Sequence, residues 1–211
     1  MERYQTIRLG SVARAEVTFS KSRFIAELAH VETPEEAATH LASVRSRHHD
    51  ARHNVPAWIL ADGTERSSDD GEPQRTAGHP TLEVLRGAGL ADVSCVTTRY
   101  FGGTLLGTGG LVRAYQAAVT EALGSAEATG VLAGMEMVVE VSVEVAYAHY
   151  EQVVRLAGSR GGKVVSTDFA TDVTLAVRFC AGEEAAFAAS LADLTAGTAL
   201  CEVGEPRIAE F

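Results

Sequence analysis

The residues after position 136 switch repeatedly between strand and helix periodicity, and the order of these switches restricts the folds open to the chain. Residues 137–145 (MVVEVSVEV) alternate apolar and polar side chains, which predicts a strand, and residues 147–156 have the spacing of an amphipathic helix. The sequence that follows predicts strand 163–167, strand 173–179, helix 183–194 and strand 200–208. The order strand, helix, strand, strand, helix, strand is typical of the ferredoxin-like split βαβ fold.

The preceding residues predict a different arrangement of strands and helices. Residues 12–20 and 23–31 are expected to form two strands joined at a polar turn, and residues 93–98 are short, β-branched and apolar, as buried strands are. The segment 33–36 (TPEE) carries three signals of a helix start: a capping threonine, a proline in the first turn and a glutamate three residues after the cap. Since strands and helices do not alternate strictly, an α+β fold with two domains is favoured over one doubly wound sheet.

Charge is distributed unevenly between the two predicted domains. The small and polar segment 124–134 (GSAEATGVLAG) is the best linker candidate, which divides the chain into domains 1–130 and 131–211. Of the formal net charge of −10, residues 1–130 carry −3 (13 Lys and Arg against 16 Asp and Glu) and residues 131–211 carry −7. This balance excludes a uniformly basic nucleic-acid binder, because phosphate contact needs clustered cations. Any anion-binding site is expected in the first domain.

The sequence shows no sign of a membrane-spanning or secretory segment. It has no run of about 20 apolar residues, and the start, MERYQTIRLG, has no apolar stretch after its first charges. Cys95, Cys180 and Cys201 are odd in number and lack CxxC spacing, so we expect buried, reduced thiols. A cytoplasmic location without a membrane partner is predicted.

The strongest local motif is the glycine-rich segment 99–115 (RYFGGTLLGTGGLVRAY), which leads from the strand at 93–98 into a helix expected from Leu111 onward. Free amides at a helix start attract anions, and Arg99 and Arg113 add positive charge at either end of the segment. The segment is neither a Walker loop nor a GxGxxG fingerprint. Two interpretations stay open: an anion- or ligand-binding loop, or a tight turn whose glycines allow close packing.

Two polar clusters raise the question of metal binding. The segment 69–72 (DDGE) holds three carboxylates, which suit a hard cation such as Mg²⁺, a helix cap or pairing with arginines. Residues 48–53 (HHDARH) are rich in histidine, but no HExxH or CxxC motif accompanies them, so we expect polar groups near a helix C-terminus rather than zinc ligands. The sequence identifies no nucleophile that His53 would activate as a general base. No metal or other cofactor is predicted.

Several motifs occur in a fixed order along residues 20–115. They are KSRF at 21–24, ARHN at 51–54, SDDGEP at 68–73, TAG at 76–78, LEVL at 82–85, RYFGG at 99–103 and LGTGGLV at 106–112. Together these motifs resemble the IMPACT family, whose bacterial members are the YigZ-like proteins. The resemblance implies an N-terminal domain with the α+β fold shared by elongation factor G domain IV and the GHMP kinases. It also implies a ferredoxin-like C-terminal domain similar to elongation factor G domain V.

The resemblance carries functional implications as well. Eukaryotic relatives regulate translation during amino-acid starvation by competing for a protein partner of a translation-factor kinase, whereas bacterial members have no settled activity. Three positions depart from the family pattern: Arg75 replaces a small residue, His79 replaces Lys or Arg, and Val55 stands where Cys is frequent. Val55 argues against thiol catalysis at that place. Arg75 either adds to an anion-binding face or alters a tight turn.

The resemblance and the arginines of the glycine-rich segment favour a non-enzymatic, translation-associated regulator or binding protein whose partner is RNA, the ribosome or a translation factor. The alternative is an enzyme acting on a small phosphorylated or nucleotide ligand, and a third interpretation is an adaptor that binds through the acidic C-terminal sheet. No catalytic residue is assigned. The residues expected at the anion- or partner-binding surface are Lys21, Arg23, His53, Asn54, Asp69, Asp70, Glu72, Arg99, Tyr100, Gly102, Gly103, Gly107, Gly109, Gly110 and Arg113.

Overall fold

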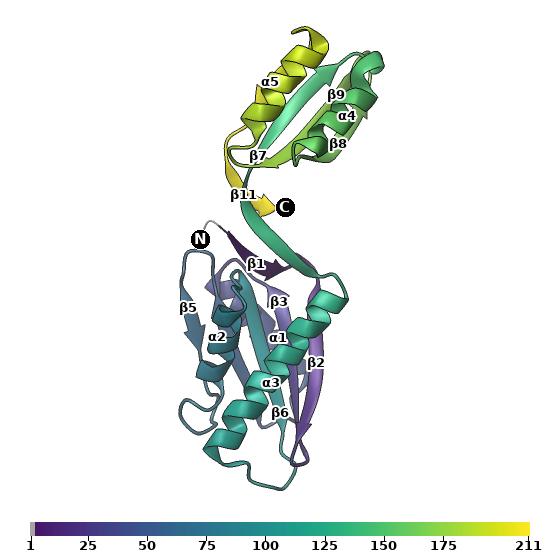
Figure 1. The fold of residues 1–211 in the computed structure, drawn as a ribbon. Helices are drawn as coiled ribbons and strands as arrows, with labels where there is room; N and C mark the ends of the chain where they lie inside the picture. Colours follow the sequence, from purple (N-terminus) through teal and green to yellow (C-terminus); the bar gives the residue numbers. More distant parts are fainter. Residues whose placement is uncertain (1–2) are drawn as a thin grey trace. The chain divides into compact units, whose positions relative to one another are not determined.

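The computed structural model describes residues 3–211, which divide into two compact units, residues 3–134 and 135–211. Figure 1 shows strands and helices in both units. The expected α+β fold class with two domains is confirmed. No helix within residues 3–211 is long and apolar enough to cross a membrane.

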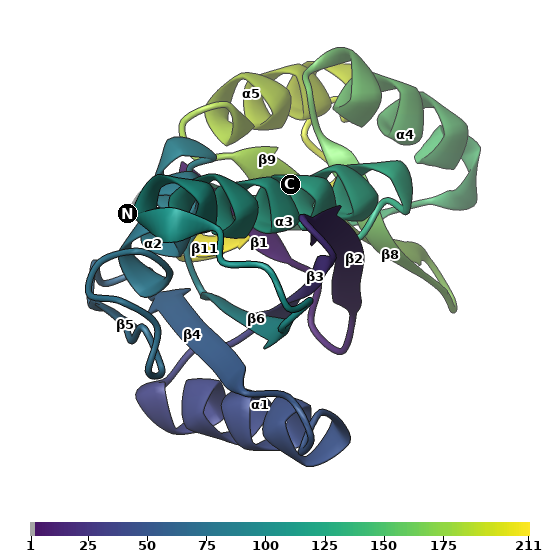
Figure 2. The same cartoon turned by 90° about the horizontal axis from the view of Figure 1, so that it is seen from below.

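The first unit is built around a five-stranded antiparallel sheet with the strand order β2-β3-β6-β4-β5. Figure 2 shows helix α1 on one face of this sheet and helix α3, with α2 packed beside it, on the other. Because helices cover both faces, β6 is buried along almost its whole length. The elements are β2 (Val12–Phe19), β3 (Ser22–His30), α1 (Pro34–Arg47), β4 (His53–Ile59), β5 (Glu65–Ser67), α2 (Gly78–Gly87), β6 (Val93–Tyr100) and α3 (Gly107–Ala128).

Helix α1 begins where the sequence predicts. The Thr33 side chain accepts a hydrogen bond from the Glu36 N–H at 3.2 Å, and Pro34 is the first helical residue. The Glu36 carboxylate accepts from the Glu32 N–H at 2.7 Å, one residue before the cap. The cap predicted from the local sequence is therefore present at this helix start.

The expected linker at 124–134 is wrong. Helix α3 begins at Gly107, four residues before the expected start, and continues to Ala128, and strand β7 begins at Leu132. The reason lies in a stripe of small residues that runs past the glycine at position 124. Every fourth residue of α3 is a fully buried alanine, at positions 114, 118, 122 and 126. These alanines let the helix pack closely along its whole length.

The second unit has the predicted order of elements. Its four main strands form the antiparallel order β10-β7-β9-β8, so β9 lies between β7 and β8, as in a split βαβ arrangement. The single final strand expected at 200–208 is wrong, because it is two strands, β10 and β11, that both pair with β7. The elements are β7 (Leu132–Val145), a short 3₁₀ helix (Tyr147–His149), α4 (Tyr150–Ser159), β8 (Lys163–Phe169), β9 (Val173–Cys180), α5 (Glu184–Thr195), β10 (Leu200–Val203) and β11 (Arg207–Glu210).

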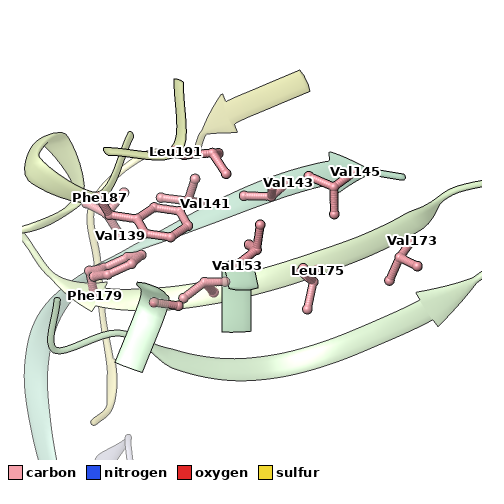
Figure 3. Close-up of a cluster of buried hydrophobic side chains, with 12 residues drawn as sticks. Val139, Val141, Val143, Val145, Val153, Val173, Leu175, Phe179, Phe187 and Leu191 are labelled. Atoms are coloured by element: carbon pink, nitrogen blue, oxygen red, sulfur yellow. The ribbon is translucent and has the colours of Figure 1, made fainter. Parts of the chain in front are cut away.

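Figure 3 shows the core of the second unit, which fills one face of its sheet. Alternate residues of β9 are buried, from Val173 to Phe179, as expected for a strand with one covered face. The rings of Phe179 and Phe187 lie 4.9 Å apart between centroids, which anchors α5 to the sheet. The alternating pattern in the sequence was therefore a reliable guide to this core.

Strand β1 (Arg3–Ile7) was not predicted from the sequence. The Gln5 N–H donates to the Gly89 carbonyl at 2.9 Å, and the Ala91 N–H donates to the Gln5 carbonyl at 3.0 Å. β1 is therefore held by the segment after α2, and it also pairs with β7 in the sheet. Both contacts are long-range and have no local signature.

The three cysteines are free thiols in different environments. Cys95 is buried, and burial raises the pKa of its thiol to about 12. Cys180 is half-buried, and Cys201 is exposed, so the expectation of three buried thiols is wrong for Cys201. It lies on β10, at the edge of the sheet, where only one neighbouring strand covers it.

Candidate functional site

The predicted site residues are divided between the two faces of the first sheet. Side chains of a strand alternate between faces, so consecutive residues of β6 point in opposite directions. Arg99 packs over the Phe24 ring, 5.4 Å from its centroid, on the face covered by α3. The Tyr100 hydroxyl lies 2.9 Å from His48 Nδ1, next to α1 on the other face. Arg99 and Tyr100 therefore belong to separate side-chain clusters.

The buried centre of the α3 face is an ion pair. Arg99 Nη1 donates to both oxygens of Glu72, at 2.7 and 2.9 Å, and the Tyr115 hydroxyl donates to Glu72 Oε1 at 2.9 Å. Burial raises the pKa of Tyr115, and the adjacent negative charge of Glu72 raises it further, so this hydroxyl remains a donor. The contacts fix the plane of the Arg99 guanidinium.

Arg99 nevertheless keeps donors that nothing in the described residues uses. Its hydrogen bonds run through Nη1 alone, and Nε is buried without a partner. The Nε and Nη2 edge of a guanidinium is one of its two-pronged donor edges, which bind carboxylate or phosphate through two parallel hydrogen bonds. Arg99 is only 6% exposed, and Nε is the atom of this edge that is buried without a partner.

A cavity of about 330 Å³ lies against this ion pair. It extends to the start of α3, whose capping position, Leu106, provides no side-chain hydrogen bond to the first-turn amides. Uncapped amides at a helix start carry partial positive charge. The cavity is lined by Arg52, His53, Glu72, Pro73, Arg99, Phe101, Leu105, Leu106, Gly107, Thr108 and Leu111.

His53 and Asn54 lie on opposite faces of β4. His53 Nδ1 lies 2.7 Å from the Asp70 carbonyl oxygen, and its Nε2 lies 3.9 Å from Glu72 Oε1. The Asn54 side chain is buried and accepts a hydrogen bond from the Thr98 hydroxyl at 2.7 Å. His53 therefore lines the cavity, and Asn54 has a structural contact away from it.

The three carboxylates of the DDGE segment have separate structural partners. Asp69 accepts hydrogen bonds from three backbone amides, those of residues 75, 77 and 78, at 2.7, 3.0 and 2.9 Å, and so holds the start of α2. Asp70 accepts from the Asn54 N–H at 2.7 Å and pairs with Arg45 of α1 at 2.5 Å. Glu72 pairs with Arg99 as described above. These contacts support the helix-cap and arginine-pair alternatives, and no cluster within residues 3–211 has the ligands for a metal ion.

The predicted glycines have different structural roles. A side chain at Gly102 would place its Cβ 2.0 Å from the Lys21 carbonyl carbon, so the loop after β6 packs directly on the β2–β3 turn. Gly103 and Gly107 have φ of +84° and +67°, which an L side chain rarely adopts. Gly109 and Gly110 lie in the first turn of α3 without positive φ. The close-packing interpretation therefore applies to Gly102, and Gly107 shapes the cavity mouth.

Among the predicted cations, only some remain without a partner in the described residues. Lys21 and Arg113 are exposed and form no ion pair within residues 3–211, and the same holds for Arg52, which the sequence did not single out. Arg23 is paired with Glu16 at 2.8 Å and lies over the Tyr100 ring, on the α1 face.

The histidine-rich segment 48–53 follows α1 and leads into β4. The backbone N–H of His48 donates to the Val44 carbonyl at 2.9 Å and so caps the helix. Burial and the neighbouring Arg14 and Arg47 lower the pKa of His48. The expected position near a helix C-terminus is confirmed.

Comparison with known proteins identifies the family. Residues 20–123 match the Impact N-terminal domain, and residues 143–198 match a domain of unknown function (DUF1949). IMPACT family member YigZ of Escherichia coli (strain K12) is 39% identical over 182 residues, which cover 84% of this chain and 87% of that protein. The chain belongs to the IMPACT family.

Other relatives extend over nearly the whole chain. An IMPACT family member of Haemophilus influenzae is 35% identical over 200 residues, covering 90% of this chain and 94% of that protein. A crystal structure described as that of a hypothetical protein is 35% identical, covers 95% of this chain and 97% of its own, and superimposes with a TM-score of 0.58. The Impact N-terminal domain match includes the residues that line the cavity.

Several cavity residues were missed by sequence reasoning. Arg52, Phe101 and Leu105 line the cavity, and Tyr115 holds Glu72. The first three fall inside or next to the motifs ARHN and RYFGG, so the motif boundaries were a usable signal. No sequence signal pointed to the role of Tyr115, since its position in the apolar stripe of the helix predicts only that it is buried.

Proposed function

We propose that this IMPACT family protein is a cytoplasmic, translation-associated binding protein whose first unit contacts RNA through its phosphate backbone. The supporting observation is a group of three exposed cations without ion-pair partners within residues 3–211: Lys21, Arg52 and Arg113. They surround the loop after β6, because Lys21 contacts Gly102, Arg52 lines the cavity with Phe101, and Arg113 reaches back towards Gly109. This loop lies at the lower end of the first unit in Figure 1.

The physical argument rests on local rather than total charge. Phosphate contacts depend on cations within a Debye length of about 10 Å at 0.1 M salt, so carboxylates farther away than this weigh little. A cation already paired with a carboxylate, such as Arg23 with Glu16, neutralises RNA phosphates less well. It therefore releases fewer of the counterions bound to the RNA. Unpaired Lys21, Arg52 and Arg113 are the better contacts. The family resemblance supports the translational setting, and fold analogy alone would not.

Binding of a fluorescein-labelled single-stranded RNA, measured by anisotropy across a salt series, tests this proposal. Reversing the charges in Lys21→Glu/Arg52→Glu/Arg113→Glu is expected to weaken binding and to lower the slope of log affinity against log salt by about 2, at about 0.7 per lost contact. A matched control, Arg66→Glu/Arg155→Glu/Arg160→Glu, makes the same change in net charge at exposed positions elsewhere. It is expected to retain the wild-type slope.

Two outcomes would overturn the RNA proposal. One is the absence of RNA binding by the wild-type protein at low salt, where phosphate contacts are strongest. The other is co-sedimentation with ribosomal fractions that persists after nuclease treatment and is as strong for the triple variant as for the wild type. That second result would point to a protein partner.

The cavity beside Arg99 favours a second candidate function, the binding of a small phosphorylated ligand. The unused donor edge of Arg99 is the observation behind it. We assign no catalytic step to this cavity, because Cys95, with its raised pKa, does not line it, and within residues 3–211 no other nucleophile is paired with His53.

A further inference from the structure

We propose that the cavity beside Arg99 is a binding site for a phosphomonoester of about nucleotide size. Its phosphate would dock on the Nε and Nη2 edge of Arg99 and on the amides at the start of α3. The proposal rests on the second candidate function above and deepens it, because it names the class of ligand and the atoms that would hold its phosphate.

The state of Arg99 carries the argument. Leaving a buried donor without a partner costs about 1–3 kcal/mol, more when the group is charged, so most native donors are paired. Arg99 Nε is such an unpaired donor in a side chain that is only 7% exposed. Glu72 occupies the Nη1 side and leaves the other edge unused. A bound oxyanion would satisfy this edge through two hydrogen bonds.

The start of α3 supplies a second, independent set of donors. Gly107 and Thr108 line the cavity, and the capping residue Leu106 makes no side-chain hydrogen bond to the amides of this first turn. A helix N-terminus favours an anion through its free amides and its dipole. A phosphate has enough oxygens to accept from Arg99 and from these amides together, whereas a planar carboxylate bound bidentately to Arg99 has few lone pairs left.

The local charge also fits a dianion. Glu72 neutralises Arg99, and the exposed Arg52 and the helix dipole then leave the cavity positive. Glu72 is held by Tyr115, so the guanidinium keeps its orientation without a ligand. Preorganisation of this kind lowers the cost of binding.

The remaining wall of the cavity is apolar. Phe101 and Leu105 are 46% and 87% exposed, which is unusual for large apolar side chains beside a buried arginine. Together with Leu111 they form a surface for the apolar or aromatic part of a ligand. A cavity of about 330 Å³ is large enough for a phosphate with an attached ring system.

The test titrates the full-length protein with adenosine monophosphate and, separately, inorganic phosphate, by isothermal calorimetry. We expect saturable binding of both, with tighter binding of the monophosphate because of its ring. Arg99→Lys keeps the charge but removes the two-pronged edge, and is expected to weaken binding at least about tenfold. Circular dichroism establishes whether this variant is folded.

A variant at the cavity rim keeps the test valid should Arg99→Lys fail to fold. Leu105→Asp places a negative charge at the rim without removing a buried contact, and is expected to abolish phosphate binding. Leu9→Asp is the matched control, since Leu9 is 84% exposed and does not line the cavity. It is expected to bind like the wild type.

The outcomes separate this proposal from RNA binding. No binding of either probe to the wild-type protein, or binding that is unchanged in Leu105→Asp, overturns the cavity proposal. Neither result bears on Lys21 and Arg113, which the cavity proposal does not use. Conversely, loss of RNA binding in the charge-reversal variant leaves the Arg99 site standing.

Discussion

Arg99 Nη1 lies 2.7 and 2.9 Å from the two carboxylate oxygens of Glu72, and the two side chains are 7% and 3% exposed. This pair joins β6 to the segment before α2 in the interior of the first unit. Removing one member leaves the other as a buried, uncompensated charge. The energetic effect should therefore far exceed that of a surface ion pair.

Glu72→Ala is expected to lower the free energy of unfolding by about 3–5 kcal/mol, because it leaves the buried charge of Arg99 without a counter-charge. It also removes the acceptor of the Tyr115 hydroxyl. Urea denaturation followed by circular dichroism measures the change. The control is Glu16→Ala, which breaks the exposed pair with Arg23 and should leave stability nearly unchanged. Equal losses in the two variants would mean that burial of the Arg99 pair contributes nothing.

A second buried carboxylate makes stability depend on pH. Burial alone would raise the pKa of Glu27, but hydrogen bonds from His40 and Arg47 outweigh it and lower that pKa to about 2. A lowered folded-state pKa stabilises the fold above the unfolded-state value of 4.5, and this stability is lost as pH falls towards 2. The full contribution is about 3 kcal/mol, since each pKa unit corresponds to about 1.4 kcal/mol.

Urea denaturation of the wild type and Glu27→Gln between pH 6 and pH 2.5 tests this linkage. The wild type should lose stability steeply below about pH 4.5, whereas Glu27→Gln should start lower and change less over the same range. Parallel curves for the two proteins would assign the acid sensitivity to other carboxylates.

The sequence predicted the elements well wherever a local signal determines them. The Thr33 cap, the alternation of β9 and the strand–helix order of the second unit all have short-range causes, and the structure agrees with each. The prediction of a linker at 124–134 was wrong because the start and end of a helix depend on tertiary packing as well as on glycine content. Strand β1 was missed because its partners, the segment around Leu90 and strand β7, lie more than 80 residues away in the sequence.

The candidate site was harder to predict for a related reason. The motifs placed His53, Glu72 and Arg99 among the residues expected at the binding surface. In the structure these three residues line the same cavity. Arg23 and Tyr100 were also expected at that surface, but they lie on the opposite face of the sheet. Which face a residue occupies depends on the register of its strand, and no motif encodes that register.

Arg75 has an unfavourable backbone conformation. Its φ is +61°, and its side chain is exposed, so nothing evident from packing requires an arginine there. The left-handed conformation costs a non-glycine residue about 1 kcal/mol or more. Arg75→Gly is therefore expected to raise the free energy of unfolding by up to about 1 kcal/mol, the net of relieved strain and added chain entropy in the unfolded state.

Arg75→Ala separates backbone strain from loss of the side chain. Alanine keeps the strained φ, and both variants keep the Arg75 N–H that donates to Asp69 at 2.7 Å. Thermal unfolding should show a higher melting temperature for the glycine variant and no gain for alanine. A gain of equal size in both variants would mean that the arginine side chain, rather than its backbone, destabilises this turn.

Gly102 and Gly109 belong to the same glycine-rich segment but face different surroundings. A methyl group at Gly102 would lie 2.0 Å from the Lys21 carbonyl carbon and 2.1 Å from its oxygen, both backbone atoms that cannot move independently. At Gly109 the nearest atom is Arg113 Nη1, at 3.5 Å, which is an ordinary contact with a flexible side chain. The first site is closed to a side chain and the second is open.

Gly102→Ala is expected to lower the free energy of unfolding by about 1–3 kcal/mol or more, because the loop after β6 must move away from the β2–β3 turn. Gly109→Ala adds a good helix former in the first turn of α3 and should be neutral or stabilising by up to about 1 kcal/mol. Urea denaturation of both variants measures the difference. If Gly102→Ala proved as stable as Gly109→Ala, the loop would not be held against the turn, and the glycine at position 102 would need an explanation in ligand contact instead. A large loss in Gly102→Ala alone assigns that glycine to packing, so the anion-binding interpretation of the segment would then rest on Arg99 and the uncapped start of α3.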